Sequence, residues 1–409
     1  MHRLLLLLPT TTYRTHDFLE AARTLGVEIV CASDEPSTFE SHAPDNLLTL
    51  DFADPDAAAA KVAALADRRP LAAVVGVDDL TAVAAAAIAE RLGLKANGRA
   101  AVAAARDKHQ MRQCLAAAGV PIPRFRRIAL KDDPFLAARG VAFPCVLKPL
   151  ALSASRGVIR ANNVDQFIAA FRRIGALLAR EDVEVSGDAA QFLLAEQYIP
   201  GIEVALEGLL MGGTLHTLAL FDKPDPLEGP FFEETIYVTP SRLPAETQAA
   251  IERVSAAACA ALGLGEGPVH AELRVNNDGP WVLEVAARSI GGLCSRTLRF
   301  GTGMTLEEII LRHALGWEIA SLARERRPAG VMMIPIPRAG RLAAVHGMAA
   351  AQNVAGIEEI AITAHVGQDV VPLPEGWQYL GFIFARADTP AAVEAALRDA
   401  HARLTFDIG

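Results

Sequence analysis

Short apolar runs alternate with alanine-rich segments of helical length over the first quarter of the chain, and this pattern strongly constrains the fold. Four runs are short enough to be strands, at residues 4–8, 27–31, 47–50 and 71–75. Strands that alternate with helices predict βαβ units and a parallel sheet. The first run leads into Pro9-Thr10-Thr11-Thr12 rather than a G-x-G-x-x-G turn, which argues against a nicotinamide dinucleotide site.

The loop after the fourth run, Gly76-Val77-Asp78-Asp79, falls at the carboxyl end of a strand. Open α/β sheets place their ligands at this edge, although an aspartate that caps the next helix is the more ordinary interpretation.

A chain of 409 residues exceeds the usual size of one hydrophobic core, so we expect several domains. The composition shifts along the chain predict an α/β and α+β multidomain protein. A parallel-sheet domain at 1–105 precedes a small α/β unit at 106–200. An antiparallel sheet with helices at 201–328 is followed by an accessory α/β domain at 329–409.

The charge pattern favours a small-molecule partner. The net charge is -9 without a long Lys/Arg run, so we expect no nucleic-acid partner. The apolar start of the chain is too short for a signal peptide, and no apolar segment approaches the roughly 20 residues that span a bilayer. Five scattered cysteines suit a reducing compartment. These features predict a cytoplasmic enzyme, with the accessory domain as a candidate homodimer surface.

A predicted hairpin carries two glutamates. His270-Ala271-Glu272 lies on one arm and Glu284 on the other, with a turn at Asn276-Asn277-Asp278-Gly279. Cross-strand pairing would place Glu272 and Glu284 close together, where like charges destabilise the sheet unless a cation lies between them. Two carboxylates without further ligands indicate Mg²⁺ held together with a nucleotide. The alternative is a pair of exposed strand-edge glutamates, or one glutamate paired with Arg274.

Two further motifs suit a nucleotide. Lys148 ends an apolar strand, and Ser153-Ala154-Ser155-Arg156-Gly157 follows as a loop whose backbone N–H groups suit phosphate. The loop is not a Walker motif and is open to interpretation as a plain turn. Farther along, Glu196-Gln197-Tyr198-Ile199-Pro200-Gly201-Ile202-Glu203 offers backbone groups for an adenine edge and a carboxylate for ribose, or a solvated hairpin edge.

Together with Arg106-Asp107-Lys108, these motifs in this order resemble the ATP-grasp superfamily, and within it the L-amino-acid ligases that form dipeptides. The resemblance runs from the first strand to about residue 325 and extends more weakly into the last 80 or so residues. It implies an ATP-grasp fold with a Rossmann-like N-terminal domain, a mobile small subdomain, and a large subdomain that holds Mg-ATP.

The resemblance also implies roles for single residues. Glu272 and Glu284 would bind Mg²⁺, with Mn²⁺ as a substitute, and Arg288 would stabilise the acyl phosphate. Alanine occupies position 286, where the family's E-x-N-x-R pattern has asparagine, and this puts the second metal contact in doubt. The implied nucleotide contacts are Lys108, Lys148, Ser153, Ser155, Gly157, Glu196, Ile199 and Glu203.

A third set of residues is implied for the substrates. Lys223 would act on the phosphate side and Glu234 would hold a substrate ammonium. Arg288, Gly291 and Gly292 would cradle a carboxylate or phosphoryl group, although the two glycines also suit a plain turn. His270 either lines the carboxylate site or is a histidine satisfied within the sheet.

The resulting expectation is an ATP-dependent ligase that activates a carboxylate as an acyl phosphate and joins it to an amine, the substrates being L-amino acids. The rival interpretations are an ATP-grasp carboxylase or purine-pathway ligase, and a nucleotide-binding sensor without turnover.

Overall fold

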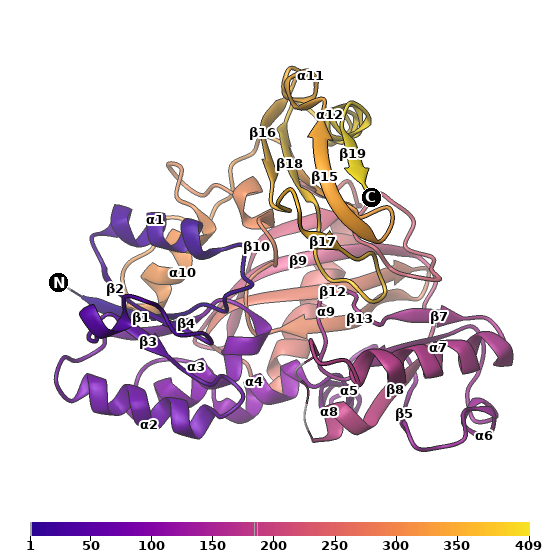
Figure 1. Ribbon diagram of the computed structural model, residues 1–409, viewed down its shortest axis with the longest axis horizontal. Helices are drawn as coiled ribbons and strands as arrows, with labels where there is room; N and C mark the ends of the chain where they lie inside the picture. Colours follow the sequence, from indigo (N-terminus) through magenta and orange to yellow (C-terminus); the bar gives the residue numbers. More distant parts are fainter. Residues whose placement is uncertain (1, 184, 186) are drawn as a thin grey trace.

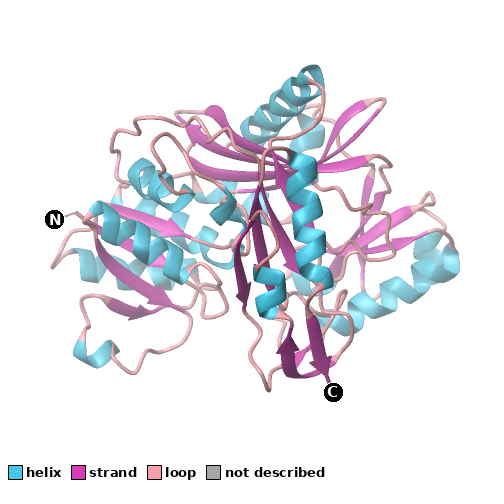
Figure 2. Ribbon diagram, turned by 90° about the horizontal axis from the view of Figure 1, so that it is seen from above, coloured by secondary structure: helices cyan, strands magenta, loops and turns pink. Residues whose placement is uncertain are grey.

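The computed structural model describes residues 2–183, 185 and 187–409. Three bodies surround a central sheet (Figure 1). The N-terminal part, in indigo, lies opposite the small sheet in magenta, and the C-terminal part, in yellow, rises above both. The two termini lie far apart on the molecule (Figure 2). This arrangement confirms the predicted α/β and α+β multidomain fold.

The N-terminal sheet is wholly parallel, with strand order β3-β2-β1-β4. Leu4 and Leu6 of its central strand enter one hydrophobic core, while Leu5 and Leu7 enter another on the opposite face. A strand buried on both faces needs no polar alternation, which explains the unbroken leucine run. The elements are β1 (Arg3–Leu7), α1 (Thr15–Leu25), β2 (Glu28–Ser33), the 3₁₀ turn η1 (Glu40–His42), β3 (Leu47–Thr49), α2 (Pro55–Ala66), β4 (Ala73–Gly76) and α3 (Asp79–Leu92).

Two helices connect this body to a small antiparallel sheet with strand order β5-β8-β6-β7. The side chain of Asp107 caps the second helix by accepting a hydrogen bond from the backbone N–H of Gln110 at 2.8 Å. The connecting helices are α4 (Arg99–Arg106) and α5 (Lys108–Ala117). The small sheet and its helices are β5 (Phe125–Ala129), α6 (Pro134–Ala138), β6 (Cys145–Pro149), β7 (Ile159–Ala161), α7 (Val164–Leu178), α8 (Asp188–Gln191) and β8 (Phe192–Gln197).

An eight-stranded antiparallel sheet forms the centre of the molecule, with strand order β13-β12-β9-β10-β11-β14-β18-β16. The helix α9 covers one face and α10 packs on the other, between the sheet and α1. The elements up to residue 314 are β9 (Ile202–Met211), β10 (Thr214–Asp222), β11 (Ile236–Thr239), α9 (Ala245–Leu262), β12 (Gly267–Asn276), β13 (Gly279–Ala286), the 3₁₀ turn η2 (Cys294–Thr297) and α10 (Leu306–Ala314).

The C-terminal segment extends this same sheet. Ile236 of β11 pairs with Met332 of β14, so the backbone hydrogen bonding continues across the predicted boundary at residue 329. The division into four domains stays a prediction. The remaining elements are β14 (Ala329–Ile334), β15 (Gly340–His346), α11 (Met348–Gln352), β16 (Ile357–Ile362), β17 (Asp369–Val370), β18 (Gly381–Arg386), α12 (Pro390–Ala402) and β19 (Thr405–Ile408).

Within the described residues, no helix is both long and apolar enough to cross a bilayer. The five cysteines are free thiols. The predicted cytoplasmic location and homodimer stay predictions.

Candidate active site

The hairpin of β12 and β13 places Glu272 and Glu284 directly opposite each other, as the turn at Asn277-Asp278 predicts. A β-bulge follows the pair, between Glu272 and Leu273. Each carboxylate meets a different lysine: Glu272 lies 3.1 Å from Nζ of Lys223, and Glu284 lies 3.3 Å from Nζ of Lys108. Each glutamate charge is thus balanced by a lysine, Lys223 directly after β10 and Lys108 at the start of α5.

Lys223 lies at the centre of a buried cluster of carboxylates. Its Nζ is 2.9 Å from Glu203 and also donates to Glu234, while its charge lies 5.0 Å from the ring centre of Tyr237. Oxygens of Glu203, Glu234 and Glu272 all lie within 4.8 Å of one another. Arg274 also pairs with Glu203, and His270 lies near Glu272. Glu234, whose only charged partner among the described residues is Lys223, is therefore the carboxylate best able to take a substrate ammonium.

Burial and charge shift the protonation of this cluster. Burial, assisted by repulsion from Glu272, raises the pKa of Glu234 to about 7. Burial opposes the charge of Lys223, but the surrounding carboxylates outweigh it and hold the lysine pKa well above its usual value. The hydroxyl of Tyr237 donates to the second oxygen of Glu234 at 2.7 Å. Glu234 therefore lies between two fixed donors.

His270 connects the glutamate pair to a loop. Its Nδ1 lies 3.1 Å from the fully buried carboxylate of Glu207, and its Nε2 lies 3.6 Å from Glu272. Burial opposes protonation, but the hydrogen bonds to the two carboxylates outweigh it and raise the pKa of His270 to about 9. Glu207 also accepts a hydrogen bond from the backbone N–H of Ile290 at 2.9 Å, which ties β9 to the loop that follows β13.

Arg288 leaves β13 and reaches the N-terminal body. Its guanidinium donates to Asp79 at 2.8 Å, and this contact outweighs burial and lowers the pKa of Asp79. In the same loop, Gly292 has a φ of 60°, and a Cβ there would meet the ring of Phe382 at 2.8 Å. Glycine is therefore required at Gly292, whereas Gly291 has open space.

Around the predicted nucleotide motifs, Glu196 is buried between Arg112 at 2.6 Å and Lys148 at 2.7 Å. These cations outweigh burial and lower the pKa of Glu196. The carbonyl of Ile199 accepts from Arg274 at 3.1 Å, and both oxygens of Glu203 are paired, one with Lys223 and one with Arg274. The structure gathers these residues, while their roles toward adenine and ribose stay predictions.

The 153–157 loop has an unusual backbone. Ala154 and Ser155 adopt φ values of 53° and 54°, although neither is glycine. Gly157 has a φ of 74°, and a Cβ there would lie 2.8 Å from Cγ of Pro149. Left-handed non-glycine residues cost about 1–3 kcal/mol each and gather at ligand-binding segments. Lys108 reaches this loop through a 2.8 Å hydrogen bond to the carbonyl of Leu152.

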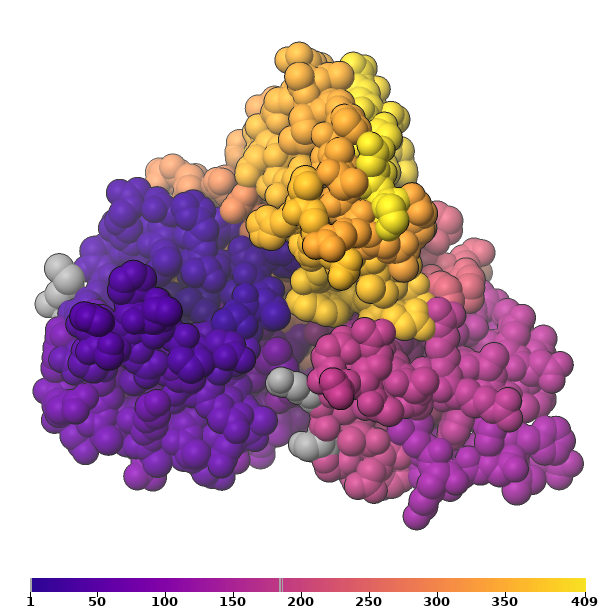
Figure 3. Space-filling model, viewed as in Figure 1, coloured from indigo at the N-terminus to yellow at the C-terminus, as the bar shows by residue number. Residues whose placement is uncertain are grey.

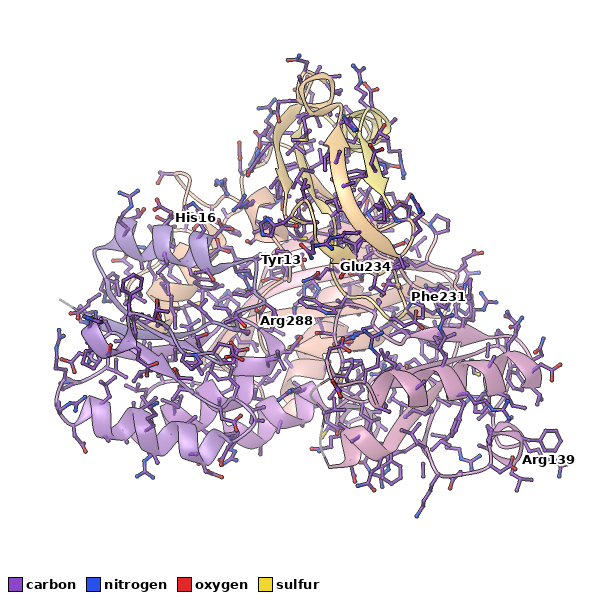
Figure 4. All side chains as sticks on the ribbon, in the orientation of Figure 1. Tyr13, His16, Arg139, Phe231, Glu234 and Arg288 are labelled. Carbon is purple, nitrogen blue, oxygen red and sulfur yellow. The ribbon has the colours of Figure 1, made fainter. Side chains whose placement is uncertain are left out.

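Glu234, Arg288 and Tyr13 lie near the middle of the molecule, where the three bodies meet, while Phe231 lies nearer the small sheet (Figure 4). The surface is hollowed there, between the indigo body and the yellow and magenta bodies (Figure 3). The predicted residues therefore converge on one cleft, and the predicted metal carboxylates fit Mg²⁺ as oxygen donors that remain partly exposed.

Sequence reasoning missed two residues of this site, Arg112 and Glu207, and the partner of a third, Asp79. Asp79 lies in the loop expected to approach ligand, but its partner is 209 residues away. Arg112 follows Lys108 by four residues on α5, a spacing that puts both on one helix face. Glu207 follows Glu203 by four residues in a strand that is otherwise apolar, so both carboxylates point to the same side.

Comparison with known proteins agrees with this architecture. The family model described as ATP-grasp domain matches residues 141–297, the ATP-grasp N-terminal domain matches residues 19–94, and the L-amino acid ligase C-terminal domain 2 matches residues 332–409. The chain therefore belongs to the ATP-grasp superfamily, as the motifs indicate.

Within this superfamily the chain is similar to ligases that form C–N bonds. The crystal structure of an L-amino acid ligase from Bacillus licheniformis superposes with a TM-score of 0.85 at 27% identity, covering 100% of this chain and 99% of the other. The alanine–anticapsin ligase of Bacillus subtilis is 27% identical over 54% of this chain. The chain spans only 49% of that relative's length.

A more distant solved structure shares the fold alone. It is the biotin carboxylase domain of the 2-oxoglutarate carboxylase from Hydrogenobacter thermophilus, in complex with MgADP and bicarbonate. It is 16% identical with a TM-score of 0.68, covering 100% of this chain and 90% of the other.

Proposed function

We propose that this chain is an ATP-dependent ligase that joins the carboxyl group of one L-amino acid to the amino group of a second. The observation that carries the proposal is the convergence of Arg288, Lys223 and the Glu272–Glu284 pair on one cleft. The similarity to L-amino acid ligases over the whole length of the chain supports the substrate class.

ATP would bind between the small sheet and the hairpin of β12 and β13. Lys108 and Lys148 come from the small-sheet side and would face the phosphates, with the 153–157 loop above them. Glu272 and Glu284 would hold Mg²⁺, for which Mn²⁺ is a plausible substitute, and the metal would neutralise phosphate charge. Glu196, Ile199 and Glu203 would border the adenine and ribose.

The reaction starts with transfer of the γ-phosphoryl group. A carboxylate oxygen attacks the γ-phosphorus, and the bond to the bridging oxygen breaks so that its electron pair remains on ADP. Positive charge from Lys108, Lys148 and Arg288 compensates the charge on the phosphoryl oxygens. Asp79 holds Arg288 in place by ion pairing at 2.8 Å.

The amine completes the reaction by attacking the carbonyl carbon of the acyl phosphate. The bound ammonium first gives up one proton to become the attacking amine, and the nitrogen gives up a second as the C–O bond to phosphate breaks, both protons passing to the departing phosphate or to solvent. The products are an amide, ADP and phosphate. The carboxylates around Lys223 suit the ammonium form of an amino acid before attack, with Glu234 as its nearest partner. The backbone N–H groups near Gly291 and Gly292 suit a carboxylate, and His270 would border this site.

The test is phosphate release from Mg-ATP across single and paired L-amino acids, with mass spectrometry of the products. We expect release that requires a particular pair and yields a mass equal to the pair less water. Glu284→Gln should lower the rate by roughly 100-fold or more, the range seen when one charge-stabilising group is lost. Glu252→Gln, on the exposed side of α9, is the matched control and should remain active.

Other outcomes separate the rival functions. Phosphate release that requires bicarbonate and no amine would contradict the proposal in favour of a carboxylase. If the protein binds ATP but turns over no pair of amino acids, and Glu284→Gln leaves ATP binding unaltered, the chain is a nucleotide-binding protein without ligase activity.

A further inference from the structure

The loop between β17 and β18 descends from the C-terminal segment onto the small sheet (Figures 1 and 3). The carbonyl of Pro374 accepts a hydrogen bond from the backbone N–H of Gly157 at 2.9 Å. The carbonyl of Glu375 accepts one from Nε of Arg156 at 2.8 Å. The 153–157 loop is thus bound directly by residues more than 200 positions away in sequence.

The carboxylate of Glu375 makes a second connection. It pairs in bidentate fashion with Arg173 of α7, at 2.5 Å from Nε and 2.8 Å from Nη2. The guanidinium of Arg173 also lies 5.0 Å from the ring centre of Phe231. Phe231 forms an isolated backbone bridge with Ile159 at the start of β7. Glu375 and Phe231 therefore contact the small-sheet body at α7 and at the start of β7.

These contacts coincide with the strained part of the loop. Two left-handed non-glycine residues persist only where the surroundings fix them, and Ala154 and Ser155 precede the residues that Pro374 and Glu375 hold. Asp182 pairs with Arg156 at 2.6 Å, so the guanidinium bridges the segment that follows α7 and the C-terminal loop.

We propose that Pro374 and Glu375 form a latch that holds the 153–157 loop closed over the nucleotide, with Glu375 as a positioning residue. This inference rests on the proposed function, because an acyl phosphate hydrolyses unless water is kept from it. Opening the latch should let water reach the intermediate and should weaken nucleotide retention. The C-terminal segment thereby controls how much ATP is converted to amide.

The experiment uses the full chain with Glu375→Gln, Arg173→Gln and the charge swap Arg173→Glu with Glu375→Arg. Hydrogen–deuterium exchange of residues 150–160 is measured with a non-hydrolysable ATP analogue. Breaking the ion pair should speed exchange about two- to fivefold, the range for one partly exposed pair, and the swap should restore much of the protection. Asp399→Asn, which breaks the exposed pair with Arg403 on α12, is the matched control and should leave exchange unchanged.

Turnover supplies the second readout. The single variants should raise the KM for ATP and the ratio of phosphate released to amide formed, with a smaller change in kcat. The latch proposal is wrong if both single variants show the wild-type exchange rate for residues 150–160 and the wild-type ratio of phosphate to amide. If the charge-swapped variant loses as much loop protection as the single variants do, the ion pair does not hold the loop.

The exchange measurement needs only the nucleotide analogue. If the wild-type chain forms no amide but the swap restores protection of the loop, the latch stands and only the proposed function fails.

Discussion

Asp79 holds the arginine that the proposed reaction requires, although the two residues belong to different bodies of the molecule. Asp79→Asn keeps the shape of the side chain but removes the charge that orients Arg288. A misplaced catalytic group typically costs about 100-fold in rate, so we expect kcat to fall roughly 10- to 100-fold while the KM for ATP changes little. Steady-state kinetics on the ligase reaction measure both values.

Asp56→Asn is the control for this prediction, because Asp56 forms an exposed ion pair with Arg99 in the same N-terminal body. The control should retain wild-type kcat. An Asp79→Asn variant with wild-type kcat and unchanged thermal stability would show that Arg288 keeps its position without this partner.

His270 should make stability depend on pH. Its pKa rises from 6.5 in the unfolded chain to about 9 in the fold, through hydrogen bonds to Glu207 and Glu272 that outweigh burial. A raised histidine pKa contributes stability that is fully present below pH 6.5 and is lost as the pH rises through about 9. The slope reaches at most about 1.4 kcal/mol per pH unit.

His270→Gln removes this titration. We expect the variant to be less stable than wild type below pH 6.5, with the difference shrinking as the pH approaches 9. Urea unfolding at a series of pH values gives the difference directly. A constant difference across that range would mean that folding does not raise the pKa of His270.

At the scale of single elements, the sequence is informative wherever the interaction is local. The leucine run predicts β1, and the Asn-Asn-Asp-Gly turn predicts the register of β12 and β13, because a turn fixes which residues face each other. The glutamate pair follows from that register. The lysine partners do not follow from it, because Lys223 lies directly after β10 and Lys108 starts α5, and no periodicity encodes which strand lies beside which.

The order of the large sheet shows the same limit. A pattern of β and α segments after residue 329 predicts the elements of the C-terminal segment, but not that β14 pairs with β11. Strand pairing between distant segments depends on matching apolar faces, and many strands of this chain offer such a face. The left-handed backbone at Ala154 and Ser155 is equally hidden, since both residues ordinarily avoid it.

At the scale of the whole molecule, continuity of the large sheet makes the C-terminal segment part of the catalytic body. Ile236 and Val238 of β11 are buried in one core with Ile334 of β14 and Leu397 of α12. Removing residues 329–409 would expose Ile236 and Val238 at about 1.5–3 kcal/mol each and leave β11 as an edge strand paired only with β10. We expect the fragment 1–328 to aggregate rather than fold.

A point substitution tests the same junction in the full chain. A Cβ at Gly330 would lie 2.7 Å from Cγ1 of Val393 and 2.8 Å from the carbonyl of Tyr237, so Gly330→Ala must push β14 away from β11 or α12. Overpacking of this kind costs about 1–3 kcal/mol, and thermal unfolding should show a lower Tm. Gly98→Ala, where the added methyl meets open space, is the matched control.

A soluble, cooperatively unfolding 1–328 fragment together with an unchanged Tm for Gly330→Ala would mean that the accessory segment folds apart from the sheet. The loop that binds Gly157 leads directly into β18, which pairs with β14, so that result would separate the latch from the body it is expected to control.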